Sequence, residues 1–431
     1  ICDIPAMGDD PYVWTETDGY LLVGDEPSFK IYDASEEAYF NVSPSRDDDD
    51  DYGFAVYEYF EIDSLMITMD YSINLHSDMN LISFYGLPED NSVSVVMQTL
   101  GDNVTFVAGS NESTILSDGD WSEDVGSLTH FDISSGYWVR MTNEAILNGD
   151  GFPYNTSREY NLQAGANLVS FPAQGEFSIS EVLPENANTH IKVIIGEGES
   201  AIQPDVWWND DSEDWIGSLD SFEGLRGYWM ITDEPISFSY DFNYNQGDSS
   251  YVFSREATPA LIAETPEGLD FIQSSEQAFY YVDGSVIEEG NVENGDWFVS
   301  FCGATVSGSR QYLGEMIDIP VMGYDGHHST AGYCEIGDTP KFKLFKSETS
   351  EMIDLYSGTP VWDSNGIFIM DNMRTSEPIP NEFSMLSAYP NPFNPITNIG
   401  FEIPEESMVE ISIFNLRGQE VETLVNGLKA P

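Results

Sequence analysis

The chain repeats itself in two ways, and this repetition constrains its fold more than any other sequence feature. The stretch INLHSDMNLISF at 73–84 returns as YNLQAGANLVSF at 160–171. Each copy is followed, in the same order and at nearly the same spacing, by Gly-Ser-Leu and then by Gly-Tyr-Trp, which lies at 136–138 and at 227–229. The sequence therefore predicts two equivalent modules of about 85 to 90 residues, because a repeated segment folds as a repeated unit.

Each of these modules is predicted to be built from β-strands. Leu and Ser alternate around a β-branched residue in NLISF and NLVSF, which is the period of a half-buried strand. A short apolar segment that fits one or two helical turns follows, then a second strand, a loop with Asp and Trp, and the Gly-Tyr-Trp strand. Trp138 and Trp229 have two interpretations here, as core side chains or as platforms on which sugars stack.

A second repeat joins the beginning of the chain to a region near residue 320. ICDIPAMGDD at 1–10 echoes MIDIPVMGYDG at 316–326, and after a loop GDEPSFKIYD echoes GDTPKFKLFK. The later copy is preceded by a segment rich in β formers and turn glycines, at 277–310, and the earlier copy is not. We therefore expect residues 1–66 to be the back half of a module whose front half is missing, removed or supplied by another chain.

These repeats predict an all-β fold with minor helix, arranged as an elongated string of β-sandwich or immunoglobulin-like modules. The predicted order is a partial A module at 1–66, modules B1 at 67–156 and B2 at 157–247, a complete A module at 248–377, and a tail β-sandwich at 378–431. Turn-rich segments at 148–155 and 241–250 are expected to be linkers. The sequence contains no run of about 18 apolar residues, so it predicts no membrane span.

The tail, SAYPNPFNPITNIGFEIPEESMVEISIFNLRGQEVETLVNG at 387–427, has alternating strands separated by Pro and Gly turns. Its words YPNPFNP, IGFEIP and VEISIFNLRGQEVETLV closely resemble the C-terminal sorting domain of proteins exported by the type IX secretion system of Bacteroidota and related bacteria. The resemblance implies an extracellular or outer-surface protein that meets the type IX export machinery through 387–427. In that family the domain continues past the equivalent of Gly427, so we expect a truncated copy here.

The net charge of the chain limits the binding partners that we expect. The chain has 76 Asp and Glu against 14 Lys and Arg, for a formal net charge of −62. Nucleic acid is excluded as an expected partner, because phosphate binding needs clustered basic side chains. The acidic residues form either a solubilising surface or, in part, calcium sites, and calcium is the only candidate cofactor. The weak calcium candidates are Asp9, Asp10, Asp25, Asp325 and Asp338, none in EF-hand spacing, and Asp47 to Asp51 are expected to form a flexible acidic loop.

Signals for catalysis are missing from the sequence. The five histidines have no metalloprotease spacing, and there is no nucleophile elbow, P-loop or dinucleotide fingerprint. A glycosidase needs only two acids at the right separation, but the sequence cannot nominate two among 76. We therefore expect no catalytic residues and no enzymatic activity. Cys302 and Cys334 are candidates for a disulfide, which leaves Cys2 odd.

These observations lead to a secreted or cell-surface structural or adhesive protein that associates with itself or with a surface partner. In a sharper version, strands of a neighbouring subunit complete residues 1–66 and the protein polymerises head to tail into a filament. The alternative is a carbohydrate-binding or degradative exoprotein, in which Trp121 and Trp215 stack on sugars. A third reading is a cargo protein whose enzyme domain lies upstream of the sequence.

Overall fold

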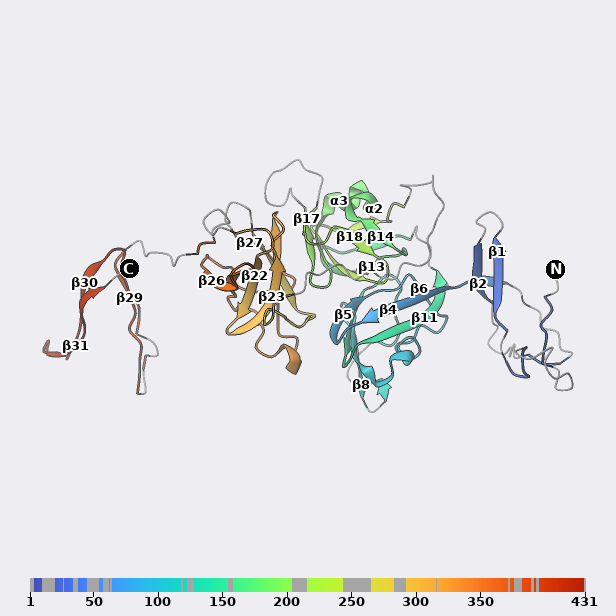
Figure 1. Cartoon of the computed structure of the whole chain (residues 1–431), viewed down its shortest axis with the longest axis horizontal. Coiled ribbons are helices and arrows are strands. Elements are labelled where there is room, and N and C mark those ends of the chain that lie inside the picture. The colour runs from blue at the N-terminus through green and yellow to red at the C-terminus, as the bar shows by residue number, and fades with distance from the viewer. Residues whose placement is uncertain are drawn as a thin grey trace.

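The computed structural model has an all-β fold with a few short helices, as predicted. The residues that it describes are 4–9, 20–25, 27–33, 38–44, 54–56, 62, 64–117, 119–121, 128–153, 158–203, 215–242, 265–282, 292–314, 316–370, 373–375, 382–388, 391–392 and 395–429. Three packed units form the middle of the molecule, and smaller β-structures extend from it at either end (Figure 1). The boundaries of the five modules stay a prediction.

Module B1 is built on a five-stranded antiparallel sheet backed by a three-stranded one. The first has the order β5 (Asp78–Ile82), β10 (Tyr137–Met141), β7 (Val104–Ala108), β8 (Ser113–Ser117), β9 (Asp120–Trp121), and the second β4 (Met69–Leu75), β11 (Ala145–Pro153), β6 (Gly86–Leu87). Helix α1 (Val93–Val96) and the 3-10 helix η1 (Gln98–Asn103) add the buried Val93, Val96 and Leu100 to the core. Phe84 and Phe131 pack together at its centre, with ring centroids 5.1 Å apart.

The prediction of a linker at 148–155 is wrong for residues 148–153, because β11 continues through Pro153 and pairs with β4 and β6. Its glycines serve close packing rather than a turn. A Cβ on Gly151 would lie 2.5 Å from backbone atoms of Leu87, so only glycine lets these strands approach. The other predicted linker is described only up to residue 242.

Module B2 repeats this architecture with equivalent residues. Its five-stranded sheet has the order β13 (Gly165–Ser170), β19 (Gly227–Thr232), β15 (Ile191–Ile195), β16 (Ser200–Ile202), β17 (Ile216–Gly217), and the smaller pairs are β12 (Tyr160–Leu162) with β20 (Ile236–Phe238) and β14 (Glu176–Ser178) with β18 (Ser221–Glu223). Helices α2 (Ile179–Val182) and α3 (Glu185–His190) follow β14. Phe171 and Phe222 stack in the core, with ring centroids 5.4 Å apart.

An equivalent asparagine in each B module fixes the turn at the start of the first strand of the five-stranded sheet. The side-chain oxygen of Asn80 accepts a hydrogen bond from the backbone N–H of His76 at 2.9 Å, and that of Asn167 accepts one from Gln163 at 2.9 Å. Because the tight turn needs a left-handed residue two positions before the asparagine, Asp78 has φ of 68° and Gly165 has φ of 97°. Local sequence therefore dictates the same strand start in both copies.

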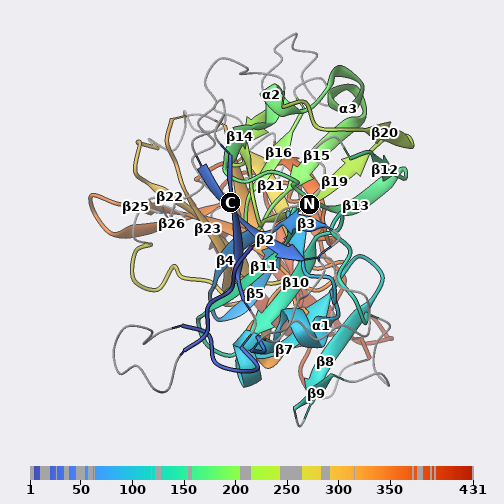
Figure 2. The same ribbon diagram turned by 90° about the vertical axis from the view of Figure 1, so that its right-hand side faces the viewer.

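The two B modules pair reciprocally. Ser83 donates its backbone N–H to the carbonyl of Leu225 at 2.8 Å, and the equivalent Ser170 donates to Ser134 at 3.0 Å. Ser134 and Leu225 occupy equivalent positions, two residues before the glycine of Gly-Tyr-Trp in each copy. Each module therefore contributes the same surface to the contact, and an approximate two-fold axis relates the two modules. Both views show B1 below B2 (Figures 1 and 2). Trp138 is buried in this interface, where Trp229 also packs.

The complete A module consists of two further sheets. One has the order β24 (Ile317–Met322), β21 (Gln277–Val282), β27 (Ile367–Met370), and the other β23 (Thr305–Gln311), β22 (Trp297–Cys302), β25 (Lys341–Lys346), β26 (Glu351–Leu355). Val193 and Ile195 of B2 pack against Phe279 and Tyr281 of β21 in a buried apolar cluster. Modules B1, B2 and complete A therefore form one packed body.

Two smaller β-structures lie at opposite ends of this body (Figure 1). The N-terminal one is a sheet of β1 (Phe29–Asp33), β2 (Ala38–Pro44) and β3 (Leu65–Ile67), in that order. The C-terminal one contains the pair β28 (Ser384–Met385) and β29 (Phe401–Glu402) and the hairpin of β30 (Ser407–Phe414) and β31 (Glu420–Lys429).

Candidate assembly site

The partial A module shares two local backbone features with the back half of the complete A module. Gly8 forms a parallel bridge with Leu21, and Gly323 forms the equivalent parallel bridge with Cys334. The turn that follows is closed by the same type of contact in both copies. The side chain of Asp25 accepts a hydrogen bond from the backbone N–H three residues before it at 2.8 Å, and that of Asp338 does so at 2.9 Å.

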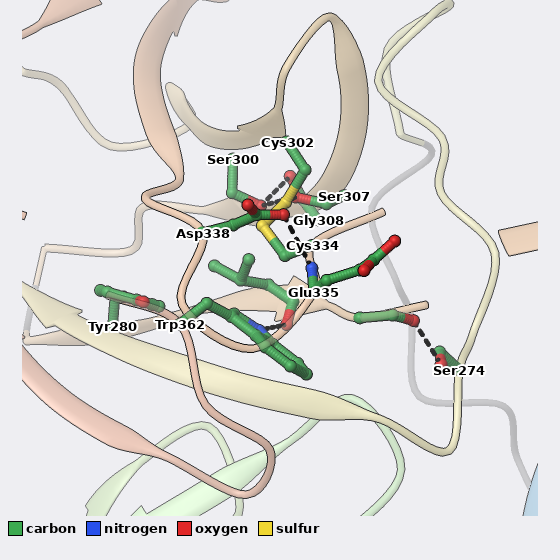
Figure 3. The surroundings of a disulfide bond; sticks show 12 residues. Ser274, Tyr280, Ser300, Cys302, Ser307, Gly308, Cys334, Glu335, Asp338 and Trp362 are labelled. Atoms are coloured by element: carbon green, nitrogen blue, oxygen red, sulfur yellow. Dashed lines mark hydrogen bonds between the residues drawn. A yellow bond between two sulfur atoms is a disulfide. The ribbon is translucent and has the colours of Figure 1, made fainter. Parts of the chain in front are cut away.

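An aromatic ring covers the glycine of this bridge in each copy. A Cβ on Gly8 would lie 2.3 Å from the ring of Phe54, and one on Gly323 would lie 2.3 Å from the ring of Trp362. Only glycine lets the ring close over the strand. In the complete module, Trp362 also donates its indole N–H to the carbonyl of Val321 at 2.9 Å (Figure 3).

The two copies differ in how much of this back half is covered. The side chains of three apolar residues in the complete module are fully buried, and their counterparts in the partial module are exposed: Ile319, Met322 and Leu344 are 0 % exposed, whereas Ile4 is 57 %, Met7 is 61 % and Ile31 is 40 % exposed. The same sequence pattern thus forms a core in one place and a surface in the other.

The front half of the complete module makes this difference. Strand β21 pairs along the whole of β24, and β22 pairs along β25. In the partial module, β1 is the counterpart of β25 and lies at the edge of its three-stranded sheet. A sheet edge beside exposed apolar side chains is the type of surface to which further strands add.

A disulfide joins the front and back halves of the complete module. Cys302 lies on β22 and Cys334 lies between β24 and β25, with Cα atoms 5.2 Å apart (Figure 3). Nearby, Ser300 of β22 donates a hydrogen bond to the carbonyl of Pro320 on β24 at 2.8 Å. In the partial module Leu21 takes the place of Cys334, so this covalent link has no counterpart there. Cys2 lies outside the described residues.

Within the packed body, one turn of B2 lies where three modules meet. Glu197 accepts a hydrogen bond from the backbone N–H of Leu81 at 2.6 Å and contacts His76 Nε2 at 2.5 Å, and both partners belong to B1. Burial alone would lower the pKa of His76, but the hydrogen bond and charge of Glu197 outweigh it and raise the pKa to about 9. Sequence reasoning missed this pair. A comparison of the two repeats would have pointed to Glu197, because GSNES at 109–113 corresponds to GEGES at 196–200.

The other side of the same turn is held by a buried polar network of the complete A module. Asp318 accepts hydrogen bonds from Ser200 Oγ and Ser218 Oγ, both at 2.8 Å, and Arg310 donates to the carbonyl of Gly198 at 2.7 Å. Tyr281 shares a 2.8 Å hydrogen bond with Ser200, and burial raises its pKa well above the ordinary value. Because Ser200 and Asp318 are fully buried, the network fixes two module faces together.

The aspartates named as calcium candidates are held by protein groups and are not brought together. Asp325 contacts Arg140 Nη2 of B1 at 2.6 Å and accepts a hydrogen bond from Thr330 Oγ1 at 2.6 Å. Asp9 lies beside the Gly8–Leu21 bridge, while Asp10 and Asp47 to Asp51 fall outside the described residues. In the part of the chain that the structure describes, no three His, Cys, Asp or Glu side chains are grouped to hold a metal ion. Calcium binding stays a prediction.

The two tryptophans named as sugar platforms lie in separate modules. Trp121 is in β9 and packs against the B1 core, and Trp215 packs against the B2 core. The indole N–H of Trp215 donates to Asn188 Oδ1 at 3.0 Å. Each ring is half-buried, so part of its surface supports the module and part faces outward.

The tail hairpin leaves several large apolar side chains exposed: Met408, Phe414, Leu416, Val421 and Leu428. This segment is where the comparisons with known proteins give a result. Residues 387–429 match the family model described as the secretion system C-terminal sorting domain. No curated protein and no solved structure gave a match to the chain.

The matched tail supports sorting by type IX secretion and marks the protein as extracellular or attached to the outer cell surface. Among the described residues, none of the helices has the length and apolar character that crossing a bilayer requires.

Proposed function

We propose that this extracellular protein is a structural or adhesive building block that acts by assembly, without enzymatic activity, in Bacteroidota or a related group. The observation that carries the proposal is the contrast between the two A modules, one with a closed core and one with the same core surface exposed. A rigid body that displays an uncovered half-module at one end is suited to joining another molecule there.

The packing of the body supports the same role. The B1–B2 interface buries Met79, Leu81 and Leu168, and the interface of B2 with complete A buries Val193 and Ile195. Apolar faces of this kind resist bending between modules, because any hinge motion would expose them to water. Such a body transmits force along its length, which a filament or a surface adhesin requires.

In its sharper form the proposal is a filament in which subunits join head to tail. A contact between two different surfaces of the same molecule does not close on itself, and it propagates when the rotation between subunits does not form a ring. The partial A module and the tail lie at opposite ends of the molecule, which suits such growth (Figure 1).

Electron microscopy and light scattering of the purified chain test this proposal. We expect end-to-end oligomers whose length grows with protein concentration, and fewer of them for the Ile4→Asp, Met7→Asp double variant. Ile336→Asp is the matched control, because Ile336 is an exposed apolar residue of the complete A module. Monodisperse single particles at every concentration, with and without calcium, would remove the filament.

The carbohydrate-binding alternative is favoured by one observation, that Trp121 and Trp215 keep part of their rings exposed. A glycan array is the test. Saturable binding that is lost in both Trp121→Leu and Trp215→Leu, but kept in a Leu416→Ser control in the tail, would favour this function over assembly.

A further inference from the structure

The structure of the complete A module defines what fits the uncovered surface of the partial A module. All six residues of β21 are buried, and five of the six residues of β22 are buried. Neither strand carries a charged side chain, and half of the residues in each are aromatic. The complement to the exposed Ile4 and Met7 is therefore a pair of extended, uncharged, aromatic-rich strands.

Backbone hydrogen bonds favour the same type of ligand. In the complete module, β22 forms a continuous antiparallel ladder with β25, from Trp297 opposite Phe345 to Phe301 opposite Lys341. Strand β1 has the equivalent position at a sheet edge, so an added strand would gain main-chain hydrogen bonds as well as apolar contacts.

The two A modules also differ in their cysteines. The complete module holds its own front half covalently through Cys302 and Cys334. The partial module has Leu21 at the equivalent position, so strands that dock there lack this particular covalent link.

We propose that the partial A module is an acceptor site for two apolar β-strands of the type of β21 and β22. The inference rests on the proposed assembly role and names the surface and the kind of partner that would carry it. The donated strands complete the sheet at β1 and cover Ile4, Met7 and Ile31.

A labelled synthetic peptide of residues 277–311, which carries Cys302, is the probe for this site. The full chain is prepared with Cys2→Ser to remove the odd thiol, and with either Leu21→Cys or Val23→Cys. Because Leu21 corresponds to Cys334, docking in the geometry of the complete module brings the new thiol at residue 21 to Cys302 of the peptide. Val23 is an exposed neighbour two residues away, which makes it the matched control.

We expect a peptide disulfide with the Leu21→Cys protein and little with the Val23→Cys protein under the same mild oxidation. Ile4→Asp with Met7→Asp should weaken binding of the peptide to the otherwise unmodified chain by about tenfold or more, because docking would bury both of these apolar side chains. Ile336→Asp should leave binding unchanged. Circular dichroism of each variant confirms that the packed body is folded.

The outcomes separate this inference from the proposed function. Unselective cross-linking, or binding that Ile4→Asp with Met7→Asp does not weaken, overturns the acceptor site even when microscopy shows filaments. Selective cross-linking by a protein that stays monomeric supports the acceptor site and removes the filament. Peptide binding by the 431-residue chain but not by protein purified from its native source also supports the acceptor site, because the site of the native protein is then already filled.

Discussion

The same turn occurs once in each B module, and the two copies have different surroundings. In B1 the backbone N–H of Gly109 donates to the carbonyl of Glu112 at 2.8 Å, and in B2 that of Gly196 donates to Glu199 at 2.9 Å. The B1 turn faces water at Ser110, whereas Glu197 at the equivalent position of B2 lies between B1 and complete A. Identical backbones therefore carry different side chains because they have different neighbours.

Other equivalent positions follow the same rule. Ile231 of β19 packs in the apolar interface between B2 and complete A, while Arg140, its counterpart on β10, forms an ion pair with Asp325. Inside the modules the residues remain alike, as Phe84 and Phe171 show. The comparison teaches that the interior of a duplicated module is constrained by its own fold, and its surface by the neighbour that each copy meets.

The largest effect is expected from the cores, where the two modules should respond alike. Phe84→Ala and Phe171→Ala each remove a fully buried ring, and each should cost about 3–5 kcal/mol of local stability. Hydrogen exchange of amides in β10 for B1 and in β19 for B2 measures each module separately. Costs that differ by more than about 2 kcal/mol would mean that neighbouring modules, and not each core alone, determine the stability of a copy.

The turns should respond differently. Glu197→Ala leaves the buried N–H of Leu81 without an acceptor and is expected to cost about 2 kcal/mol, whereas Ser110→Ala on the exposed turn should change stability by less than about 0.5 kcal/mol. Urea unfolding followed by tryptophan fluorescence reports both. Glu197→Gln, which keeps an acceptor oxygen, should recover part of the loss. Equal effects of the alanine variants at the two turns would contradict the assigned role of Glu197.

Sequence reasoning reached the β-class and the export address because both depend on local patterns. Alternation in NLISF and NLVSF predicted β5 and β13, and the words around IGFEIP identified the sorting segment that the family model also matches. Cys302 and Cys334, named as candidates for a disulfide, do form one. In each case residues close in sequence, or few in number, carry the information.

Contacts between modules could not be predicted from the sequence. Nothing in the residues around Trp138 shows that this side chain meets Leu168 of the next module instead of its own core or a sugar. The junction of His76, Glu197 and Asp318 joins residues separated by more than a hundred positions. Such contacts depend on how folded units dock, which alternating hydrophobicity within one unit does not encode.

A smaller effect is expected at the turn that opens each five-stranded sheet. Gly165→Ala puts a side chain at a φ of 97° with no atom within 4 Å of the new Cβ, so the cost is backbone strain alone, about 1 kcal/mol. The reciprocal change, Asp78→Gly, should be neutral or stabilising by up to about 0.5 kcal/mol. Thermal unfolding of the two variants measures this. A loss well above about 1 kcal/mol in Gly165→Ala would instead indicate a contact specific to B2.

An effect of similar size tests the junction through pH. The pKa of His76 is raised to about 9 in the folded protein, so its stabilising contribution is complete below the ordinary value near 6.5 and is lost as pH rises through about 9. Half of the side chain is exposed, and water screens its pairing with Glu197, so we expect a loss of only about 1 kcal/mol between pH 6.5 and 9.5. His76→Gln is the informative variant, because B2 has Gln163 at the equivalent position. It should unfold with a free energy that is flatter over this pH range than that of the parent. Parallel curves for parent and variant would show that the contact with Glu197 does not depend on the charge of His76.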